Sequence, residues 1–392
     1  MTTAVAIEGT CDARFQGVKE AFAQNFADYA EVGVAVAVMV DGRMVVDVWG
    51  GHADAARTRP WGQDTIANVF STTKGITAIC AHQLVDQGLL DIDAPVAKYW
   101  PEFAQSGKAE VPVRFLFSHR AGLPAIRQEL PSGAMYDWEA MTTALAAEEP
   151  WWEPGSKHGY HAVTFGHLLG ELVRRISGKT LGTYLQDEVA GPLGLDFRVG
   201  LPAEDDARTA EMVPIPEEEM MQRDTPLAKA LANPQSITFK ALANPPDLML
   251  PGTVNTRAWR AAEIPAANGH GTARALARVY GALARGGELD GVRVLSREAI
   301  ERARIEQSYG EDAVLAGLPS RFGLGFMLDL PEYKIAPGGD IFGHPGAGGS
   351  IGFADPESGI GFGYVMNKMI IPPEYFVDPR WRGLIDATYA AL

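Results

Sequence analysis

The sequence predicts an α+β protein in which an antiparallel sheet is flanked by helices and interrupted by an inserted, mostly helical domain. Strand-like runs lie near the N-terminus, at 33–51, and return near the C-terminus, at 322–365. Segments with helical periodicity fill the middle of the chain. Strands that are far apart in sequence can pair within one sheet. We therefore predict a discontinuous sheet domain, 1–72 with 268–392, and a helical domain at 73–267.

The first predicted element is an antiparallel hairpin at 33–51, in the segment GVAVAVMV-DG-RMVVDVWGG. Runs rich in β-branched residues, which favour strands, lie on both sides of Asp41-Gly42. An Asp-Gly dipeptide readily takes the two positive-φ positions of a tight hairpin turn.

Two helices are predicted in the middle of the chain. From Phe165 the apolar residues recur at positions i, i+3, i+4, i+7, i+8 and i+11, which is the pattern of one helix face. Gly178 follows as the expected C-cap. A similar apolar stripe runs through 76–88 and ends at Gly88.

Residues 202–255 differ in character, with acidic clusters and the two steps Asn233-Pro234 and Asn244-Pro245. An X-Pro step disfavours the continuation of a helix, because the proline ring clashes with a helical backbone at the preceding residue. We interpret the segment as an irregular insertion that lies over a pocket. A solvated surface loop is an equally good interpretation.

The C-terminal part of the chain is predicted to alternate between helices and strands. The elements are a helix at 272–285, strands at 322–328, 350–353 and 360–365, a turn at 356–359 and a final helix at 379–391. Proline and glycine bound the turn, and both residue types favour turns.

Composition and charge exclude several classes of protein. The 392 residues are 46% hydrophobic and 21% charged, as in ordinary globular proteins. With 34 Lys and Arg against 49 Asp and Glu, the net charge is −15, which argues against nucleic-acid and anionic-membrane partners. The longest apolar run, at 32–40, is about half of a membrane span, and no signal-peptide pattern is present, so a cytoplasmic location is expected.

Cys11 and Cys80 form no CxxC pair, which indicates free thiols.

The first candidate for chemistry is Ser71-Thr72-Thr73-Lys74. If Ser71 opens a helix, Lys74 lies one turn further on the same face, where its amine can reach the serine hydroxyl. A serine needs a base to become nucleophilic, and a buried lysine can lose its proton near neutral pH. A helix N-terminus also offers free N–H groups to a reacting carbonyl. The alternative is that Ser71 is a plain helix cap.

A second serine motif, Gly348-Gly349-Ser350-Ile351-Gly352, matches the GxSxG spelling of α/β-hydrolase nucleophiles. In those enzymes the acidic residue and the histidine follow the serine. Every histidine of this chain precedes Ser350: His52, His82, His119, His158, His161, His167, His270 and His344. We therefore predict that Ser350 is not a nucleophile and that its glycines let the backbone pass close to a bound ligand.

Three histidines, His158, His161 and His167, are close enough in sequence to be considered as metal ligands. No HExxH or CxxC motif accompanies them, and no glycine-rich phosphate loop is present. Ordinary turn and helix histidines are the better interpretation. We predict neither a metal nor an organic cofactor.

Four longer segments follow one another in a recognisable order. They are FSTTKGITAICAHQLVDQGLLDIDAPVAKYWPEF, PVRFLFSHRAGLP, WWEPGSKHGYHAVTFGHLLGELVRRISGKTLGTYLQDEVAGPLGL and FGHPGAGGSIGFADPESGIGFGYVMN. In this order they resemble the serine β-lactamase and penicillin-binding-protein superfamily. Within it the chain is most similar to the class C β-lactamase-like family VIII carboxylesterases, from about residue 30 to residue 392. The resemblance implies a β-lactamase-like fold.

The same resemblance implies roles for individual residues. Ser71 corresponds to the nucleophile, Lys74 to its partner base and Tyr160 to the tyrosine of the second motif. The third motif corresponds to His344-Pro345-Gly346, and the oxyanion hole to the backbone N–H groups of Ser71 and Ala347. Whether Lys74 or Tyr160 is the base stays open, because coupled groups titrate as a pair.

The motifs also depart from the β-lactamase pattern. Ala162 stands where the second motif has asparagine, and His344 and Pro345 stand where the third motif has lysine and threonine. A neutral imidazole anchors a substrate carboxylate less well than an ammonium group does. A neutral ester needs no such anchor. We therefore expect a cofactor-independent serine carboxylesterase that hydrolyses small, short-acyl esters.

The remaining expectations concern substrate contacts. His344 and Gly346 are expected to contact substrate, with support of the backbone as the alternative role for His344. Trp151-Trp152 either lines an acyl pocket or packs in the core or rim. The alternative functions are a β-lactamase (weak or cephalosporin-type) or DD-peptidase, and an acyltransferase or non-catalytic penicillin-binding-like scaffold. The oligomeric state stays open.

Overall fold

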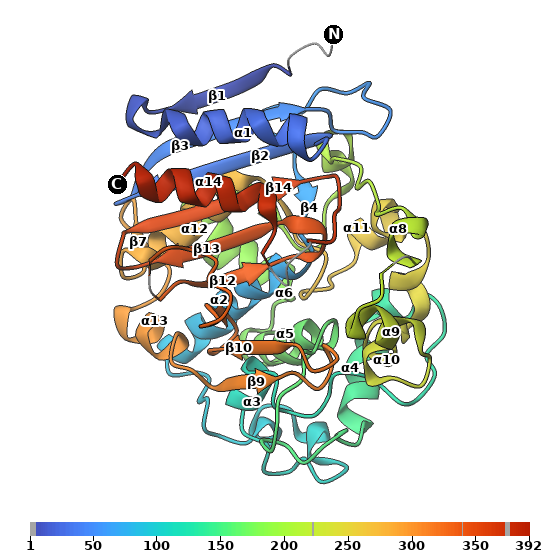
Figure 1. Ribbon diagram of the computed structural model, residues 1–392. Coiled ribbons are helices and arrows are strands. Elements are labelled where there is room, and N and C mark those ends of the chain that lie inside the picture. The colour runs from blue at the N-terminus through green and yellow to red at the C-terminus, as the bar shows by residue number, and fades with distance from the viewer. Residues whose placement is uncertain (1–4, 222, 339, 373–376) are drawn as a thin grey trace.

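The computed structural model describes residues 5–221, 223–338, 340–372 and 377–392. Over these residues, nine strands form one antiparallel sheet in the order β1-β3-β2-β14-β13-β12-β11-β10-β9. Because β2 pairs with β14, strands from the two ends of the sequence lie side by side (Figure 1). Their bounds are β1 Ile7–Cys11, β2 Gly33–Val40, β3 Arg43–Gly51, β9 Ser308–Glu311, β10 Pro319–Phe322, β11 Met327–Leu328, β12 Phe342–Pro345, β13 Ile351–Asp355 and β14 Ile360–Met366.

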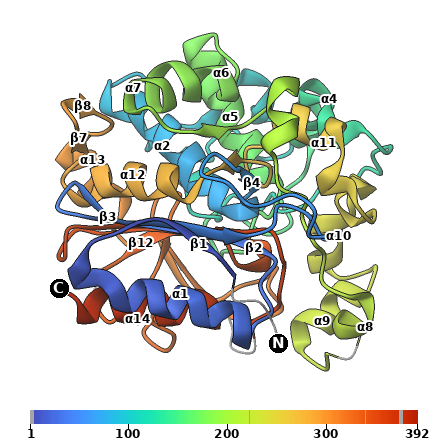
Figure 2. The same ribbon diagram turned by 90° about the horizontal axis from the view of Figure 1, so that it is seen from above.

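Helices cover both faces of this sheet (Figure 2). The first and last helices, α1 and α14, lie together on one face, and α12 packs on the opposite face against β14 and β2. The helices are α1 Gln16–Asp28, α2 Thr73–Asp86, α3 Arg114–Phe117, α4 Trp138–Ala147, α5 Thr164–Ser177, α6 Leu181–Leu185, α7 Gly191–Leu193, α8 Glu217–Met221, α9 Pro226–Ala232, α10 Ile237–Ala243, α11 Arg257–Ala261, α12 Ala273–Ala284, α13 Arg297–Ala303 and α14 Pro379–Ala390. On β14, a Cβ at Gly361 would lie 2.2 Å from the backbone nitrogen of Gly281, so glycine allows α12 to approach the sheet backbone.

Two small sheets complete the fold. The strands β4 Ala67–Asn68, β6 His270–Gly271 and β5 Phe197–Arg198 form one, and β7 Glu288–Leu289 pairs with β8 Val292–Arg293 in the other. The first of these sheets fixes the chain just before α2, because the N–H of Val69 also donates to the Gly269 carbonyl at 2.8 Å.

The predicted N-terminal hairpin is confirmed. β2 and β3 pair in antiparallel fashion around Asp41 and Gly42, whose φ angles of 50° and 79° are the positive values that the turn requires. The two central helices are also confirmed. α5 ends at Gly178, with φ of 73°, and α2 ends just before Gly88, with φ of 71°.

One detail of the predicted C-terminal half is wrong. The strand expected at 322–328 is split, because β10 ends at Phe322 and β11 begins at Met327. Between them Gly325 has φ of 86°, where an added Cβ would lie 2.4 Å from Cβ of Ala78 on α2. The chain therefore turns against α2 instead of continuing the strand. The helices at 273–284 and 379–390 and the strands β13 and β14 are as predicted.

The insertion at 202–255 is more regular than predicted. It contains α8, α9 and α10, which lie at one edge of the molecule (Figures 1 and 2). The two Asn-Pro steps still mark boundaries, because α9 is capped by Asn233 and α10 by Asn244. The side chains of Thr225 and Ser236 cap the N-termini of α9 and α10. Threonine and serine are preferred N-cap residues, so these two positions indicate helix starts.

All strands of the large sheet fall within the ranges predicted for the discontinuous domain, and we keep the boundaries 1–72 with 268–392 and 73–267 as a prediction. Among the helices of the described residues, none combines the length and the apolar character that a membrane crossing requires. Cys11 and Cys80 are free thiols, as expected.

Candidate active site

Ser71 lies in a 3₁₀ turn, Phe70–Thr72, that leads directly into α2. Phe70 has φ of 44°, a left-handed conformation that costs a non-glycine residue on the order of 1–3 kcal/mol. Neighbouring bonds hold it, because the Thr73 hydroxyl donates to the Phe70 carbonyl at 2.5 Å. Phe70 and Thr73 are buried, whereas Ser71 is partly exposed. The strained turn thus presents the Ser71 side chain at the surface of an otherwise buried segment.

Lys74 brings its amine to Ser71 from one turn further along. Its Nζ lies 3.0 Å from Ser71 Oγ, 2.7 Å from the Ala162 carbonyl oxygen and 2.9 Å from the Ala266 carbonyl oxygen. The side chain is fully buried, and burial lowers the pKa of Lys74 well below its usual value. A neutral amine has two N–H donors and one lone pair. The three contacts match that set, with both carbonyls accepting and the lone pair facing the Ser71 hydroxyl.

Tyr160 meets this pair from the segment before α5. The Nζ of Lys74 lies 4.7 Å from the centroid of the Tyr160 ring, and the ring of Phe322 stacks on that ring with a centroid distance of 6.2 Å and an interplanar angle of 10°. Burial raises the pKa of the Tyr160 phenol, and a polar contact with the side chain of Ser71 partly opposes the rise. The phenol is therefore protonated at neutral pH and lies beside the Ser71 hydroxyl.

The backbone at Gly346 lies close to the turn that carries Ser71. A Cβ there would lie 2.2 Å from the Val69 carbonyl oxygen and 2.2 Å from Ser350 Oγ. The third-motif segment therefore passes directly against the turn that carries Ser71, and a side chain at this position would push the two apart.

His344 on β12 lies in the wall of the site. It is 2% exposed, and its ring centroid lies 6.0 Å from that of Tyr160. Its Nδ1 is 2.7 Å from the Pro345 carbonyl oxygen, so we assign the proton to Nδ1; Nε2 has no hydrogen-bond partner within the described residues. Burial, with a smaller contribution from Lys74, lowers the pKa of His344 to about 3. The imidazole is therefore neutral.

Two backbone N–H groups are candidates for an oxyanion hole, those of Ser71 and Ala347. Ala347 opens the 3₁₀ turn Ala347–Gly349, and Ser71 lies in a 3₁₀ turn of its own. The first N–H groups of a helical turn have no partner within the turn. The backbone bonds recorded for the described parts of the chain use the N–H of Gly346 and that of Gly349, but neither that of Ser71 nor that of Ala347.

The side chain of Arg380, on α14, supports the turn Ala347–Gly349. Its fully buried guanidinium donates to the carbonyls of Gly348 and, at 2.7 Å, Lys368, and it pairs with Asp378 at 2.7 Å. A buried charge is costly unless it is paired and hydrogen-bonded, and these contacts satisfy it. The position of the turn is therefore fixed by the last helix.

Trp151 and Trp152 lie in one apolar cluster with Tyr160. The insertion contributes Ile237 and Ala241 of α10 to the same cluster. Trp151 is partly exposed, whereas Trp152 is 9% exposed. The two tryptophans form part of an apolar wall beside Tyr160, and their contact with substrate stays a prediction.

Ser350 has no base. Its hydroxyl is fully buried, donates to the Val69 carbonyl at 2.7 Å and lies 3.1 Å from Thr72 Oγ1. This geometry supports the prediction that the GxSxG match is not a nucleophile motif. Ser350 instead ties the third-motif segment to the Ser71 turn.

The three candidate metal histidines do not converge. His161 accepts from the N–H of Leu123 through Nε2, at 3.0 Å, and its Nδ1 lies 2.7 Å from the Gly159 carbonyl oxygen. His167 has no hydrogen-bond partner for either ring nitrogen within the described residues. Over residues 5–221, 223–338, 340–372 and 377–392, no group of three or more His, Cys, Asp or Glu side chains is placed to hold a metal ion.

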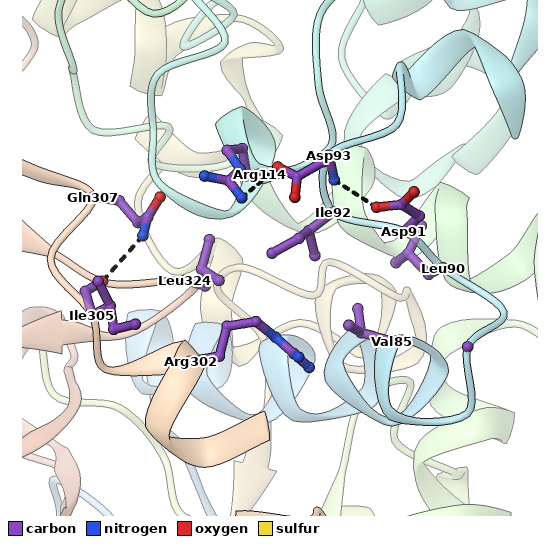
Figure 3. Close-up of a pocket in the computed structure, with 11 residues that line it drawn as sticks. Val85, Leu90, Asp91, Ile92, Asp93, Arg114, Arg302, Ile305, Gln307 and Leu324 are labelled. Atoms are coloured by element: carbon purple, nitrogen blue, oxygen red, sulfur yellow. Dashed lines mark hydrogen bonds and ion pairs between the residues drawn. The ribbon is translucent and has the colours of Figure 1, made fainter. Parts of the chain in front are cut away.

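A cavity of about 470 Å³ lies at the other end of α2 (Figure 3). Val85 lines it, and at 1.5 Å per residue Val85 is roughly 16 Å from Lys74 along the helix axis. Its wall includes the ion pair of Arg114 with Asp93. None of the candidate site residues lines this cavity, so it is separate from the site around Ser71.

Three buried groups around the site were not predicted. The Nδ1 of His119 accepts from the N–H of His161 at 3.0 Å, Asp312 accepts from the N–H of Tyr160 at 2.9 Å, and Arg380 holds the Ala347 turn. His119 belongs to the segment PVRFLFSHRAGLP, which was a usable signal. No local pattern distinguishes Asp312 or Arg380 from ordinary charged residues.

Comparisons with known proteins agree with this geometry. The chain matches the family model described as Beta-lactamase over residues 18–387. It is 41% identical over 372 residues to the Esterase/beta-lactamase LipL of Mycobacterium tuberculosis (strain ATCC 25618 / H37Rv), covering 93% of this chain and 83% of that protein. A solved structure of a family VIII carboxylesterase is 44% identical, with a TM-score of 0.89 and coverage of 99% and 100%. A penicillin-binding protein homologue from Caulobacter crescentus is 41% identical, with a TM-score of 0.87 and the same coverage.

These matches confirm the predicted α+β, β-lactamase-like fold and the resemblance to family VIII carboxylesterases. Family model, relative and solved structures each span nearly the whole of this chain. The chain belongs to the Beta-lactamase family.

Proposed function

We propose that this protein is a serine carboxylesterase that hydrolyses short-acyl esters through an acyl-enzyme on Ser71. The observation that carries the proposal is the 3.0 Å contact between Ser71 Oγ and Nζ of Lys74, a buried amine whose pKa is lowered by desolvation. An unprotonated amine beside a serine hydroxyl is equipped to act as a general base. The likeness to an esterase relative and to a solved carboxylesterase supports the reaction class.

In the acylation step, Lys74 takes the hydroxyl proton of Ser71 as Oγ bonds to the ester carbonyl carbon. The N–H groups of Ser71 and Ala347 donate to the oxyanion, an interaction of about 3–4 kcal/mol per donor. When the ester C–O bond breaks, Tyr160, whose pKa is raised by burial, gives its proton to the leaving alkoxide. The proton held by Lys74 then restores the phenol.

Deacylation reverses these roles. Lys74 takes a proton from water as the water oxygen attacks the acyl carbonyl. The bond from the acyl carbon to Ser71 Oγ then breaks, and Oγ recovers a proton from the Lys74–Tyr160 pair. The acid leaves and the site returns to its starting protonation.

The neutral state of His344 favours a neutral substrate. Its pKa is lowered to about 3 by burial, so the third motif offers no cation to a substrate carboxylate. Esters need no such cation, whereas penicillins and peptide termini carry a carboxylate. A β-lactamase or DD-peptidase is therefore the second candidate, favoured by the part of the relative's name that reads beta-lactamase. An acyltransferase or a non-catalytic scaffold is the third. The predicted cytoplasmic location belongs to the same proposal.

The test compares p-nitrophenyl butyrate with the cephalosporin nitrocefin as substrates of the purified protein. We expect kcat/KM for the ester to exceed that for nitrocefin. Faster turnover of nitrocefin would establish the second candidate, and turnover of neither would favour the scaffold.

A fluorophosphonate probe then identifies the nucleophile. We expect one adduct by intact mass and, after proteolysis, a labelled peptide that contains Ser71. A labelled peptide that contains Ser350 would contradict the assignment.

A further inference from the structure

Asp312 is a fully buried carboxylate that begins the 312–318 loop between β9 and β10. Both of its oxygens are hydrogen-bonded. Oδ1 accepts from the N–H groups of Tyr160 at 2.9 Å, Val314 at 2.8 Å and Leu315 at 3.0 Å, and Oδ2 accepts from Ser320 Oγ at 2.8 Å. Two of the four donors belong to the loop itself, which would satisfy an ordinary turn. The bond to Tyr160 is different, because it crosses to the segment that carries the proposed acid.

We infer that Asp312 is a positioning residue for ester hydrolysis, whose carboxylate holds the backbone of Tyr160 so that the phenol meets Ser71 and the leaving group. The inference rests on the function proposed above. It assigns the 308–322 hairpin a part in catalysis although no side chain of its loop reaches Ser71 in the contacts described above.

A second connection through Ser320 reinforces the first. Because the Ser320 hydroxyl donates to Asp312, it accepts from Nε2 of His158, which lies 3.0 Å away. Burial lowers the pKa of His158 more than the neighbouring Asp312 carboxylate raises it. The His158 carbonyl also accepts from the N–H of Ala313 at 3.2 Å. Residues 158–160 are thus fastened to the hairpin at three points, all next to Asp312.

The same loop holds the apolar wall of the site. Val314, whose N–H donates to Asp312, packs in the cluster that contains Trp152 and Tyr160. Its carbonyl accepts from the hydroxyl of Thr238 on α10 at 2.6 Å. One carboxylate therefore sets the position of Tyr160 on one side and of the insertion on the other.

The charge of Asp312 has its own effect on Tyr160. After burial, it contributes to the raised pKa of the phenol. The other titratable groups packed around the ring are Lys74, His119 and His344, and burial lowers the pKa of each, which favours their neutral forms. Removal of the Asp312 charge should therefore let the phenol ionise at a lower pH.

The first experiment compares Asp312→Ala with Asp355→Ala. Asp355 is a matched control: it is fully buried in the β13–β14 hairpin, accepts from the N–H of Glu357 at 2.9 Å through one oxygen, and accepts from the Tyr389 hydroxyl at 2.5 Å through the other. With rates corrected for active sites titrated by fluorophosphonate, we expect Asp312→Ala to lower kcat about 100-fold with little change in KM, since a displacement of about 1 Å has that effect. Asp355→Ala should lose stability and keep its kcat per active site.

Asp312→Asn covers the case in which the alanine variant does not fold. Asparagine keeps an oxygen for the backbone N–H groups and removes the charge. We expect a smaller loss of kcat than in Asp312→Ala, and an alkaline limb of kcat/KM that begins at lower pH than in the wild type. A merely structural role would leave that limb in place.

A double-mutant cycle separates this inference from the proposed function. If Asp312 acts through Tyr160, Asp312→Asn should have almost no further effect in a Tyr160→Phe background. Full, independent losses in the two variants, or equal kcat losses in Asp312→Ala and Asp355→Ala, would overturn the inference and leave the esterase proposal intact. If the wild type does not hydrolyse esters, or if Tyr160→Phe retains full activity, the proposed mechanism itself fails.

Discussion

Ser71 and Ser350 are neighbours in the structure, and each matches a serine-nucleophile motif, yet their surroundings differ. The Oγ1 of Thr72, the residue next to Ser71, lies 3.1 Å from Ser350 Oγ. Ser350 is fully buried, and its hydroxyl donates to the Val69 carbonyl. Ser71 is partly exposed, and its hydroxyl faces the buried amine of Lys74.

The difference shows that a serine motif needs a base beside its hydroxyl. A backbone carbonyl accepts a hydrogen bond, but it is far too weakly basic to remove the proton, so the Ser350 hydroxyl stays a hydroxyl. In the proposed mechanism the Lys74 amine acts as the base, because burial lowers its pKa. Ser350 stabilises the turn that carries Ser71, whereas Ser71 faces the Lys74 amine and is partly exposed to solvent.

The largest expected effect is that of Ser71→Ala. Loss of a serine nucleophile lowers kcat by about 10⁴-fold or more, so hydrolysis of p-nitrophenyl butyrate should fall to near the uncatalysed rate. Labelling by the fluorophosphonate should disappear as well. Substantial residual turnover in this variant would mean that Ser71 is not the nucleophile.

Lys74→Met should have the next largest effect. Methionine keeps an unbranched chain in the buried space and removes the base, so we expect kcat to fall about 10³-fold, within the range for a general base. Lys74→Arg is the control, since guanidinium stays protonated and should not restore activity. An active Lys74→Arg enzyme would show that the amine is not the base.

The pH dependence follows from the direction of the Lys74 pKa shift. The pKa lies well below its usual value, which raises the fraction of neutral amine near neutral pH. The kcat/KM should fall about tenfold per unit once the pH drops below this pKa. Rate measurements between pH 4 and 9 test this expectation. An activity that is constant down to the acid-unfolding range would contradict a neutral lysine base.

Acid unfolding must be measured in the same buffers. Burial lowers the pKa of His161 to about 4 and of His344 to about 3, against about 6.5 for the unfolded chain. Because the unfolded state then binds more protons, stability falls as the pH drops below about 6.5 and continues to fall toward the folded-state values. Tryptophan fluorescence gives the folded fraction with which each rate is corrected.

The smallest expected effect is that of Ser350→Ala. It leaves the Val69 carbonyl without its donor, so we expect a loss of about 1–3 kcal/mol in the free energy of unfolding. The kcat should change by less than fivefold, because the variant keeps the Ser71–Lys74 contact. Thermal unfolding and ester hydrolysis are the two measurements. A loss of kcat as large as that of Ser71→Ala would remove the distinction between the serines.

Features with a local signature were predictable from the sequence. The Asp41-Gly42 hairpin, the apolar face of α5 and the spacing of Ser71 and Lys74 each depend on a few consecutive residues. Their geometry follows from turn chemistry and helical periodicity. The order of several motifs carried the family resemblance, which implied the fold and the roles of Ser71, Lys74 and Tyr160.

Features made by tertiary contact were not predictable. Asp312 and Arg380 acquire their importance from partners that lie 152 and 32 residues away, at Tyr160 and Gly348. The strand expected at 322–328 breaks because Gly325 meets α2, which no short window of sequence reveals. The helices of the insertion were not predicted, because its Asn-Pro steps argue against a continuous helix. The N-cap residues Thr225 and Ser236 indicate two short helices instead.

Because Arg380 contacts the Ala347 turn, the site can be complete only after the ribosome has synthesised the C-terminal part of the chain. Arg380 lies on α14, the last helix in the sequence, whereas Ser71 lies near the beginning. A growing chain on the ribosome can form the hairpin of β2 and β3 early. Until α14 has emerged, it lacks the support of the Ala347–Gly349 turn, to which the proposed mechanism assigns oxyanion binding. Incomplete chains should therefore have no premature hydrolase activity.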